Sequence, residues 1–178
     1  LSAHFTALEI GARAMTARLP VNIMYRPSKN RALSYVLGRA RARRARRAIS
    51  RDDIRTLVSA LRANETVWYA PDQAYRNKGA VNAPFFGIPA GTNTATSRLA
   101  RATGAAVLPY FPERLPGGRG YRAVIHPPLE NFPSGDLMAD ATRLNGLIEA
   151  QVRRVPEQYL WLHRRFKGLG EDYPNYYA

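Results

Sequence analysis

The pentapeptide TVWYA, residues 66–70, decides the fold that this sequence predicts. It is apolar along most of its length, without the alternation of a half-exposed strand, and Pro71 closes it. Such a run is typical of a strand that is buried on both faces within a parallel sheet. VNIMY, residues 21–25, has the same character and predicts a second strand of this kind.

Helical and strand patterns alternate along the rest of the chain. Helices are expected at residues 6–18, at 31–48, from an N-cap at Ser50 to about Arg62, at 94–103 and at 136–154. Two more strands are expected at residues 105–111 and 120–126, around the turn LPGGR, and a loop at residues 72–92. This order predicts an α/β fold, with a mainly parallel sheet flanked by helices.

Ligands of such folds gather at the carboxyl ends of the strands. We therefore expect a site formed by HFTALE (residues 4–9), by the segment after TVWYA and by the segment after VNIMY. HFTALE itself has two interpretations. Thr6 and Glu9 have the spacing of a capping box, which would only start a helix.

In the second interpretation, Glu9 orients His4 for catalysis. Five helical residues turn a side chain by about 140°, so the two residues cannot share a helix face. They can meet if His4 lies in the loop before the helix and folds over its start. Glu9 would then hold one imidazole nitrogen and leave the other free as a general base.

The composition narrows the classes of function. The chain has 178 residues and is 46% hydrophobic, which fits one globular domain and excludes a disordered tail. It has no cysteine, and His4, His126 and His163 lack metal-ligand spacing, so no metal and no cofactor are expected. The net charge of +14 predicts an anionic partner, which can be nucleic acid, a membrane or a phosphorylated or acidic substrate.

Several motifs follow one another in a set order. They are His4 with Glu9, YRP (25–27), WYAPDQ (68–73), PFFG (84–87) and PEQYLWLHRRFK (156–167). This order resembles the bacterial lipid A late acyltransferases, the lauroyl/myristoyl transferases of lipopolysaccharide synthesis. That family lies within the glycerolphosphate-acyltransferase superfamily, whose signature is His-x4-Asp or His-x4-Glu. The resemblance covers nearly the whole chain and implies a glycerolphosphate-acyltransferase-like fold.

The resemblance also has implications for domain organisation and location. The family's N-terminal membrane helix and first strands have no counterpart here, so residues 1–178 are expected to be a single acyltransferase domain without that part. The family implies the cytoplasmic face of the inner membrane as the location. An anionic membrane surface is then an expected partner.

The reaction implied by the resemblance is acyl transfer from an acyl carrier protein thioester to a hydroxyl of a phosphorylated lipid A precursor. His4 would be the general base that takes the hydroxyl proton, and Glu9 would orient it. The acceptor oxygen would attack the thioester directly, so the reaction needs no covalent acyl-enzyme.

Four further residues are candidates for substrate binding. Arg41 falls where the family has an important arginine, within the run from Arg39 to Arg47; it would clamp phosphate or an acidic carrier, or else belong to a solvated cationic helix. Asp72 and Gln73 suit hydrogen bonds to sugar or hydroxyl groups, although Asp72 could simply shape a turn. Arg26 would bind phosphate or pair with a local carboxylate.

The end of the chain is aromatic and basic. This character suggests a membrane interface formed by Trp161, His163, Arg164, Arg165 and Lys167. Two other functions remain as alternatives: the same chemistry on another glycolipid, and a nucleic-acid-binding protein that uses the Arg39–Arg47 helix. Aromatic residues are not interleaved with that arginine run, as a base-stacking surface requires, so no nucleic-acid partner is expected.

Overall fold

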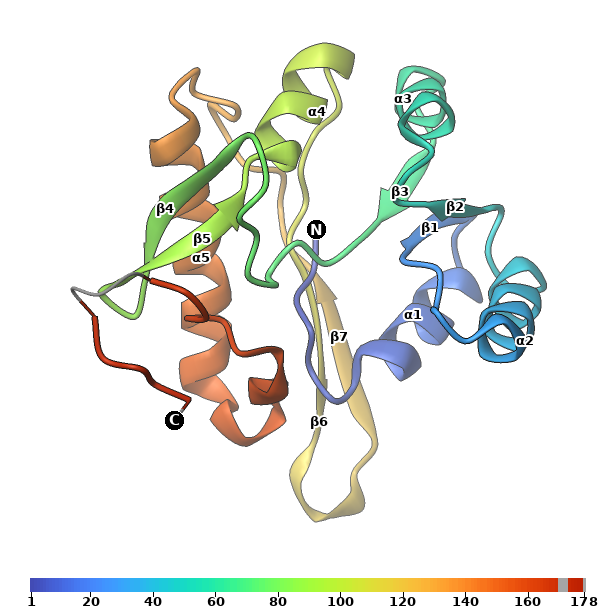
Figure 1. The fold of residues 1–178 in the computed structure, drawn as a ribbon. Helices are drawn as coiled ribbons and strands as arrows, with labels where there is room; N and C mark the ends of the chain where they lie inside the picture. Colours follow the sequence, from blue (N-terminus) through green and yellow to red (C-terminus); the bar gives the residue numbers. More distant parts are fainter. Residues whose placement is uncertain (170–172, 178) are drawn as a thin grey trace.

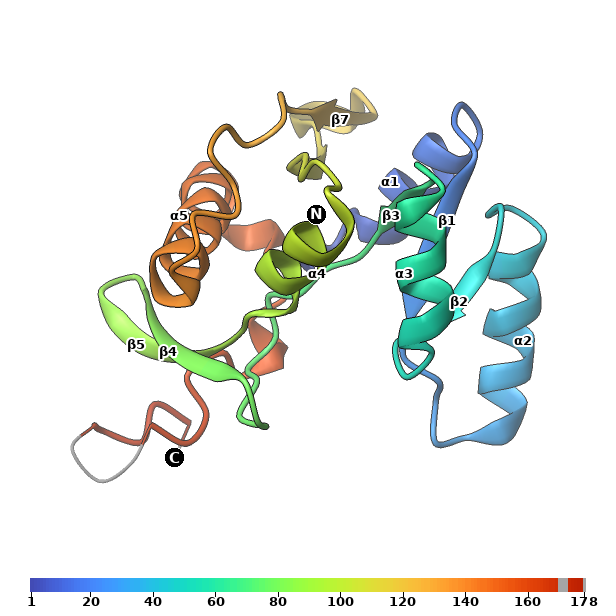
Figure 2. The ribbon, with the colours of Figure 1, turned by 90° about the horizontal axis from the view of Figure 1, so that it is seen from above.

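The computed structural model describes residues 1–169 and 173–177. Its helices are α1 (Leu8–Thr16), α2 (Arg31–Ala42), α3 (Ile54–Arg62), α4 (Ala95–Thr103) and α5 (Leu137–Arg154). Its strands are β1 (Val21–Tyr25), β2 (Ala48–Ser50), β3 (Thr66–Trp68), β4 (Ala80–Phe85), β5 (Ile88–Asn93), β6 (Tyr110–Arg114) and β7 (Tyr121–Ile125). In both ribbon views, β1 to β3 with α1 to α3 lie on one side of the molecule, and α5 with β4 and β5 lies on the other (Figures 1 and 2).

The strands β2, β1 and β3 form a parallel sheet in that order. Helix α1 packs on one face, where Met15 joins a buried cluster with Val21 and Ile23 of β1. Helix α3 packs on the other face, where Leu57 contacts a cluster around Ile49 of β2. The expected parallel sheet flanked by helices is therefore present. It is smaller than expected, because the other described strands pair in two antiparallel hairpins.

One of these hairpins stands where the sequence predicted a loop. Strands β4 and β5 pair antiparallel, with Pro84 opposite Pro89. Phe86 and Gly87 make the two-residue turn, and both have positive φ, as tight hairpin turns of this length require. The prediction of a loop at residues 72–92 was wrong because prolines and glycines usually interrupt strands, whereas in this two-stranded sheet both strands are edge strands, which tolerate them.

Several boundaries also differ from the prediction: α1 is shorter than residues 6–18, and β6 begins at Tyr110 rather than at residue 105. Asn30 caps α2 by accepting a hydrogen bond from the backbone N–H of Leu33, but α2 ends at Ala42 rather than at residue 48. The chain then enters β2, which the sequence did not predict. Asp53, not Ser50, caps α3, because its carboxylate accepts the backbone N–H of Thr56. The ends of α4 at Gly104 and of α5 near Arg154 agree with the prediction.

A second core lies between α5, the β4–β5 hairpin and the N-terminal segment. Its buried aromatic rings come from four separate parts of the chain: Phe5, Phe85, Phe111 and Tyr159. Phe5 and Tyr159 also form an isolated antiparallel bridge, so residues 4–6 run beside residues 158–160. Within residues 1–169 and 173–177, no helix has the length and apolar character needed to cross a membrane.

Candidate active site

His4 lies on an extended segment that is fixed on both sides by backbone hydrogen bonds. The N–H of Ser2 donates to the carbonyl of Tyr69, just after β3, over 2.9 Å. On the other side, the carbonyl of His4 accepts the N–H of Leu160, also over 2.9 Å. The N-terminal segment therefore passes the carboxyl end of β3, where the α/β prediction placed the site.

Asp72 holds His4 through both of its carboxylate oxygens. Oδ1 lies 2.6 Å from the imidazole Nδ1, and Oδ2 accepts the backbone N–H of His4 over 2.9 Å. Asp72 is almost fully buried, whereas the His4 side chain is 22% exposed. Burial acts to raise the pKa of Asp72, but the hydrogen bonds and charge interaction with His4 together hold that pKa below its usual value.

This contact defines the protonation of the imidazole. An ionised carboxylate can only accept, so Nδ1 of His4 carries the proton that lies between it and Asp72. Nε2 is then left with its lone pair, as a general base requires. The amide nitrogen of Gln73 lies 3.4 Å from Nε2 and can donate weakly to that lone pair. The structure thus brings three predicted site residues, His4, Asp72 and Gln73, into one group.

Glu9 lies apart from this group. Helix α1 begins at Leu8 with Ala7 as its N-cap and no side-chain cap, so the predicted Thr6–Glu9 capping box was wrong. The Glu9 side chain is 78% exposed, and its carboxylate pairs with Arg41 over 3.3 Å. Asp72, rather than Glu9, contacts the His4 imidazole in this structure. Whether Glu9 takes part in catalysis remains a prediction.

Arg41 and Arg26 lie around the end of β1. The guanidinium of Arg41 stacks over the ring of Tyr25 at 5.6 Å, in addition to its pair with Glu9. Arg26 is exposed and follows directly after the strand. Among the residues that the structure describes, Arg26 forms no ion pair, so the local carboxylate considered as its partner is not found there. A role of either arginine in binding phosphate stays a prediction.

His163 belongs to the site, although the sequence suggested a structural or interfacial role. Its ring centroid lies 4.5 Å from that of His4, with 34° between the planes. Burial lowers the pKa of His163, the charge of His4 lowers it further, and Asp72 opposes the shift. His163 is therefore neutral at pH 7 beside the candidate base. The spacing of residues 4 and 163 gave no signal for this contact.

The membrane-interface position predicted for Arg165 was wrong, because its side chain is buried. It is 3% exposed, and its guanidinium donates to the Gly91 carbonyl and to Thr92 Oγ1, both over 2.7 Å. It also lies over the Phe85 ring at 5.3 Å. Arg165 thus joins the end of the chain to the β4–β5 hairpin and is no part of a membrane-facing surface. Trp161 and Leu162, by contrast, are exposed.

The carboxylates and imidazoles of the described residues are mostly dispersed. No group of three or more His, Cys, Asp or Glu side chains within the described ranges is arranged to hold a metal ion. The chemistry available to the His4 group is proton transfer by an imidazole that a buried carboxylate orients. The fold and the site together define an α/β protein with a hydrogen-bonded histidine–carboxylate pair beyond the end of β3.

Comparison with known proteins then gives the family. A family model described as bacterial lipid A biosynthesis acyltransferase matches residues 1–168. The chain belongs to this family, as its ordered motifs predicted. It is 42% identical over 165 residues to the lipid A biosynthesis palmitoleoyltransferase of Escherichia coli (strain K12), covering 92% of this chain and 54% of that protein.

Two further relatives show similar coverage. The lipid A biosynthesis lauroyltransferase of the same bacterium is 38% identical over 175 residues, which is 98% of this chain and 57% of that protein. A lipid A biosynthesis acyltransferase of Haemophilus influenzae (strain ATCC 51907 / DSM 11121 / KW20 / Rd) is 37% identical over 166 residues. That match covers 92% of this chain and 53% of that protein. The chain spans about half the length of the curated relatives it matches.

Proposed function

We propose that the protein containing this chain transfers a fatty acyl chain from an acyl carrier protein thioester to a hydroxyl of a phosphorylated lipid A precursor. The observation that carries the proposal is the 2.6 Å contact between His4 Nδ1 and Asp72 Oδ1, which leaves Nε2 free to accept a proton. Family membership supports acyl transfer to lipid A and favours an enzyme over a basic nucleic-acid-binding protein.

In the proposed reaction, Nε2 of His4 removes the proton from the acceptor hydroxyl. The hydroxyl oxygen forms a bond to the thioester carbonyl carbon, and a tetrahedral intermediate results. The carbon–sulfur bond then breaks, and the proton on Nε2 passes to the leaving thiolate. Asp72 keeps Nδ1 protonated and stabilises the transient imidazolium by its negative charge. The nucleophile belongs to the substrate, so the chain itself contributes a base and not a covalent acceptor.

The surrounding residues have supporting roles in this proposal. The Gln73 amide donates toward Nε2 of His4 over a long 3.4 Å contact. The acceptor hydroxyl would replace Gln73 at Nε2, and the Gln73 amide would then help to position that hydroxyl. His163 is neutral and its ring packs against that of His4. It therefore restrains the imidazole without repelling the positive charge that His4 gains during the reaction. Arg41, held by Glu9, would receive a phosphate of the acceptor, with Arg26 as a second cation nearby.

The proposed site of action is the cytoplasmic face of the inner membrane. Trp161 and Leu162 follow the His4-bound Leu160 and are 48% and 87% exposed, so an apolar surface lies beside the base. Aromatic and apolar side chains of this kind suit the lipid interface. We also place the fold in the glycerolphosphate-acyltransferase superfamily, because His4 and Glu9 match its signature and the parallel sheet has flanking helices.

The test is a transfer assay with the full-length protein in detergent. Acyl carrier protein loaded with radiolabelled lauroyl or myristoyl chains is the donor, and a tetra-acylated, phosphorylated lipid A precursor is the acceptor. Wild type is compared with His4→Ala and with the control His126→Gln, a second histidine whose ring packs edge-on against Phe111. We expect His4→Ala to lose roughly 10²–10⁴-fold in turnover and the control to stay near wild type.

The outcomes separate the parts of the proposal. Label that moves to the lipid only when His4 is present supports both the reaction class and the base. Near-normal turnover of His4→Ala would show that His4 is not the base. No transfer by folded wild type would reject this acceptor and leave the same chemistry on another glycolipid.

A further inference from the structure

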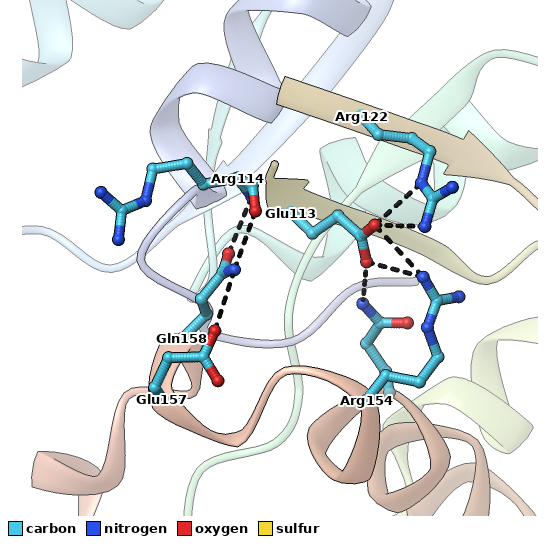
Figure 3. A network of polar contacts seen from close by, with 7 residues as sticks. Glu113, Arg114, Arg122, Arg154, Glu157 and Gln158 are labelled. Atoms are coloured by element: carbon cyan, nitrogen blue, oxygen red, sulfur yellow. Dashed lines mark hydrogen bonds and ion pairs between the residues drawn. The ribbon is translucent and has the colours of Figure 1, made fainter. Parts of the chain in front are cut away.

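A polar pocket lies apart from the His4 site, between the turn of the β6–β7 hairpin and the C-terminal end of α5. It has a volume of about 850 Å³. Its charged lining consists of four arginines and two glutamates: Arg114, Arg119, Arg122, Arg154, Glu113 and Glu157. Figure 3 shows this region, with side chains from β7 and α5 converging on Glu113 of β6.

Glu113 organises two of the arginines. Its carboxylate is nearly buried and accepts from Arg122 Nε over 2.8 Å and from Arg154 Nη2 over 2.9 Å (Figure 3). Gln151 adds a third donor over 3.1 Å. These donors together hold the pKa of Glu113 below its usual value, against the effect of burial, which acts to raise it. Glu113 is therefore ionised at pH 7 and fixes two guanidinium groups.

The fixed arginines keep donors that Glu113 does not use. Each guanidinium has five N–H groups in a planar fork. Arg122 contacts Glu113 through Nε and Nη2, and Arg154 contacts it through Nη2, so each guanidinium has further N–H groups that do not bond to Glu113. Guanidinium groups that are already oriented lose less conformational entropy when they bind an anion than free side chains do.

The end of β6 and the hairpin turn add two more cations. Gln158 accepts the backbone N–H of Arg114 over 2.8 Å and donates to its carbonyl over 3.0 Å, so the Arg114 backbone is tied to the turn after α5 (Figure 3). Arg119 donates through Nε to the Pro116 carbonyl over 3.1 Å. Both residues line the pocket and are exposed, and neither contacts Glu113. The Arg114 side chain extends to the side of the pocket away from Glu113 (Figure 3).

The charge balance of the lining identifies the ligand chemistry. Four arginines and two glutamates leave a formal surplus of two positive charges. A phosphate monoester carries about −1.5 to −2 at pH 7 and accepts several hydrogen bonds, and arginine matches it with paired donors. We propose that this pocket binds a phosphate group, presented on a lipid headgroup or free in solution. The proposal does not depend on the acyl transfer assigned to the His4 site.

The test measures binding of phosphate directly. Full-length protein in dodecyl maltoside is titrated by calorimetry with inorganic phosphate and, separately, with dioctanoyl phosphatidic acid. Dioctanoyl phosphatidylcholine, which has no net charge, controls for binding of the lipid tails. All proteins carry Arg41→Ala, which removes the phosphate clamp proposed for the active site.

The informative variant is Arg114→Gln with Arg119→Gln. It removes two charges of the pocket without touching the Glu113 contacts, so we expect it to fold. The matched control is Arg55→Gln with Arg101→Gln, two exposed positions on α3 and α4, at the opposite end of the molecule from the hairpin turn (Figure 1). We expect the pocket variant to weaken the Kd for phosphate by about tenfold or more and the control by less than about twofold.

Either source of phosphate supports the proposal. Tighter binding of phosphatidic acid than of inorganic phosphate assigns the pocket to a lipid headgroup, and similar Kd values assign it to phosphate alone. Absence of saturable binding of both probes would overturn the proposal. An equal Kd in the pocket variant and the control variant would overturn it as well.

Discussion

Asp72 touches His4 at two points, the imidazole and the backbone N–H, and so fixes both the ring and the segment that carries it. A single carboxylate therefore controls the tautomer, the orientation and the position of the candidate base. Because Asp72 is buried, water does not compete for these contacts. The effect of changing this residue on turnover should exceed that of changing an exposed carboxylate such as Glu9.

The replacement Asp72→Asn tests this control of the tautomer. The amide group of asparagine can donate to Nδ1, which would move the imidazole proton to Nε2 and block the base. We expect turnover in the transfer assay to fall about 10³–10⁴-fold, while thermal unfolding remains cooperative. If turnover of a folded Asp72→Asn protein stayed within about tenfold of wild type, Asp72 would not orient the base.

The pair of Arg41 and Glu9 gives a second prediction at this scale. We expect Arg41→Ala to raise the KM for the phosphorylated acceptor more than it changes thermal stability, because an exposed ion pair contributes only about 0–1 kcal/mol to folding. Glu9→Gln should change the acceptor KM in the same direction, and the double variant should resemble Arg41→Ala alone. Additive effects of the two changes on KM would show that Glu9 acts through another group.

The sequence identified most of this site, but not its contacts. His4, Asp72 and Gln73 were found because strand ends of an α/β fold meet at one edge. Which carboxylate would reach the imidazole depended on where α1 starts, and it starts at Leu8 rather than at the predicted cap. The contact with His163 joins segments that lie 159 positions apart, and no local pattern in the sequence encodes it.

At the scale of elements, the contact of α1 with β6 joins the helix that covers the parallel sheet to the β6–β7 hairpin. Gly11 lies against Pro112, and its carbonyl accepts the hydroxyl of Tyr110 over 2.8 Å. A Cβ at Gly11 would overlap the Pro112 ring. Since both groups are buried and the proline is rigid, neither can move without disturbing the core.

We therefore expect Gly11→Ala to destabilise the protein by about 1–3 kcal/mol in urea unfolding. The control is Gly38→Ala in α2, where a Cβ would meet no atom within 4 Å. Alanine is the better helix former, so the control should stabilise by about 0.5–1 kcal/mol. Equal effects of the two substitutions would mean that α1 and β6 are not closely packed in solution.

Long elements were easier to predict than short ones. The 18-residue helix α5 carries enough hydrophobic repeats, with Asp136 as its cap, to be recognised from its pattern. The strand β2 has three residues and follows an arginine-rich helix, so it has no pattern of its own. β2 pairs with β1 because Ile49 packs against α3 in the folded protein. This tertiary contact cannot be predicted from the local sequence.

At the scale of the whole molecule, buried or hydrogen-bonded carboxylates join parts of a strongly basic chain. Asp72 joins the N-terminal segment to the segment after β3, and Glu113 joins β6 to β7 and α5. Glu65 pairs with Arg46 and Arg47 and accepts from Asn22, so it joins β3 to β1. With a net charge of +14, loss of these negative charges also increases self-repulsion.

This arrangement predicts that the protein loses stability in acid. The hydrogen bonds from their partners hold the pKa values of Asp72, Glu65 and Glu113 below the usual values, although burial opposes the shift. A carboxyl with a lowered folded pKa contributes stability above its unfolded pKa and loses it as the pH falls through the folded value. The urea midpoint should therefore fall most steeply below about pH 4, and the lowered pKa of His163 should add a smaller loss between pH 7 and 5.

Glu113→Gln separates this linkage from general charge repulsion. The variant should be less stable than wild type at pH 7, because Arg122 and Arg154 lose their shared anion, and its midpoint should fall less steeply in acid. Glu130→Gln removes an exposed carboxylate that has no ion pair among the described residues, and it should keep the wild-type slope. If both variants kept that slope, self-repulsion of the basic chain, rather than the ion pairs of Glu113, would determine its acid sensitivity.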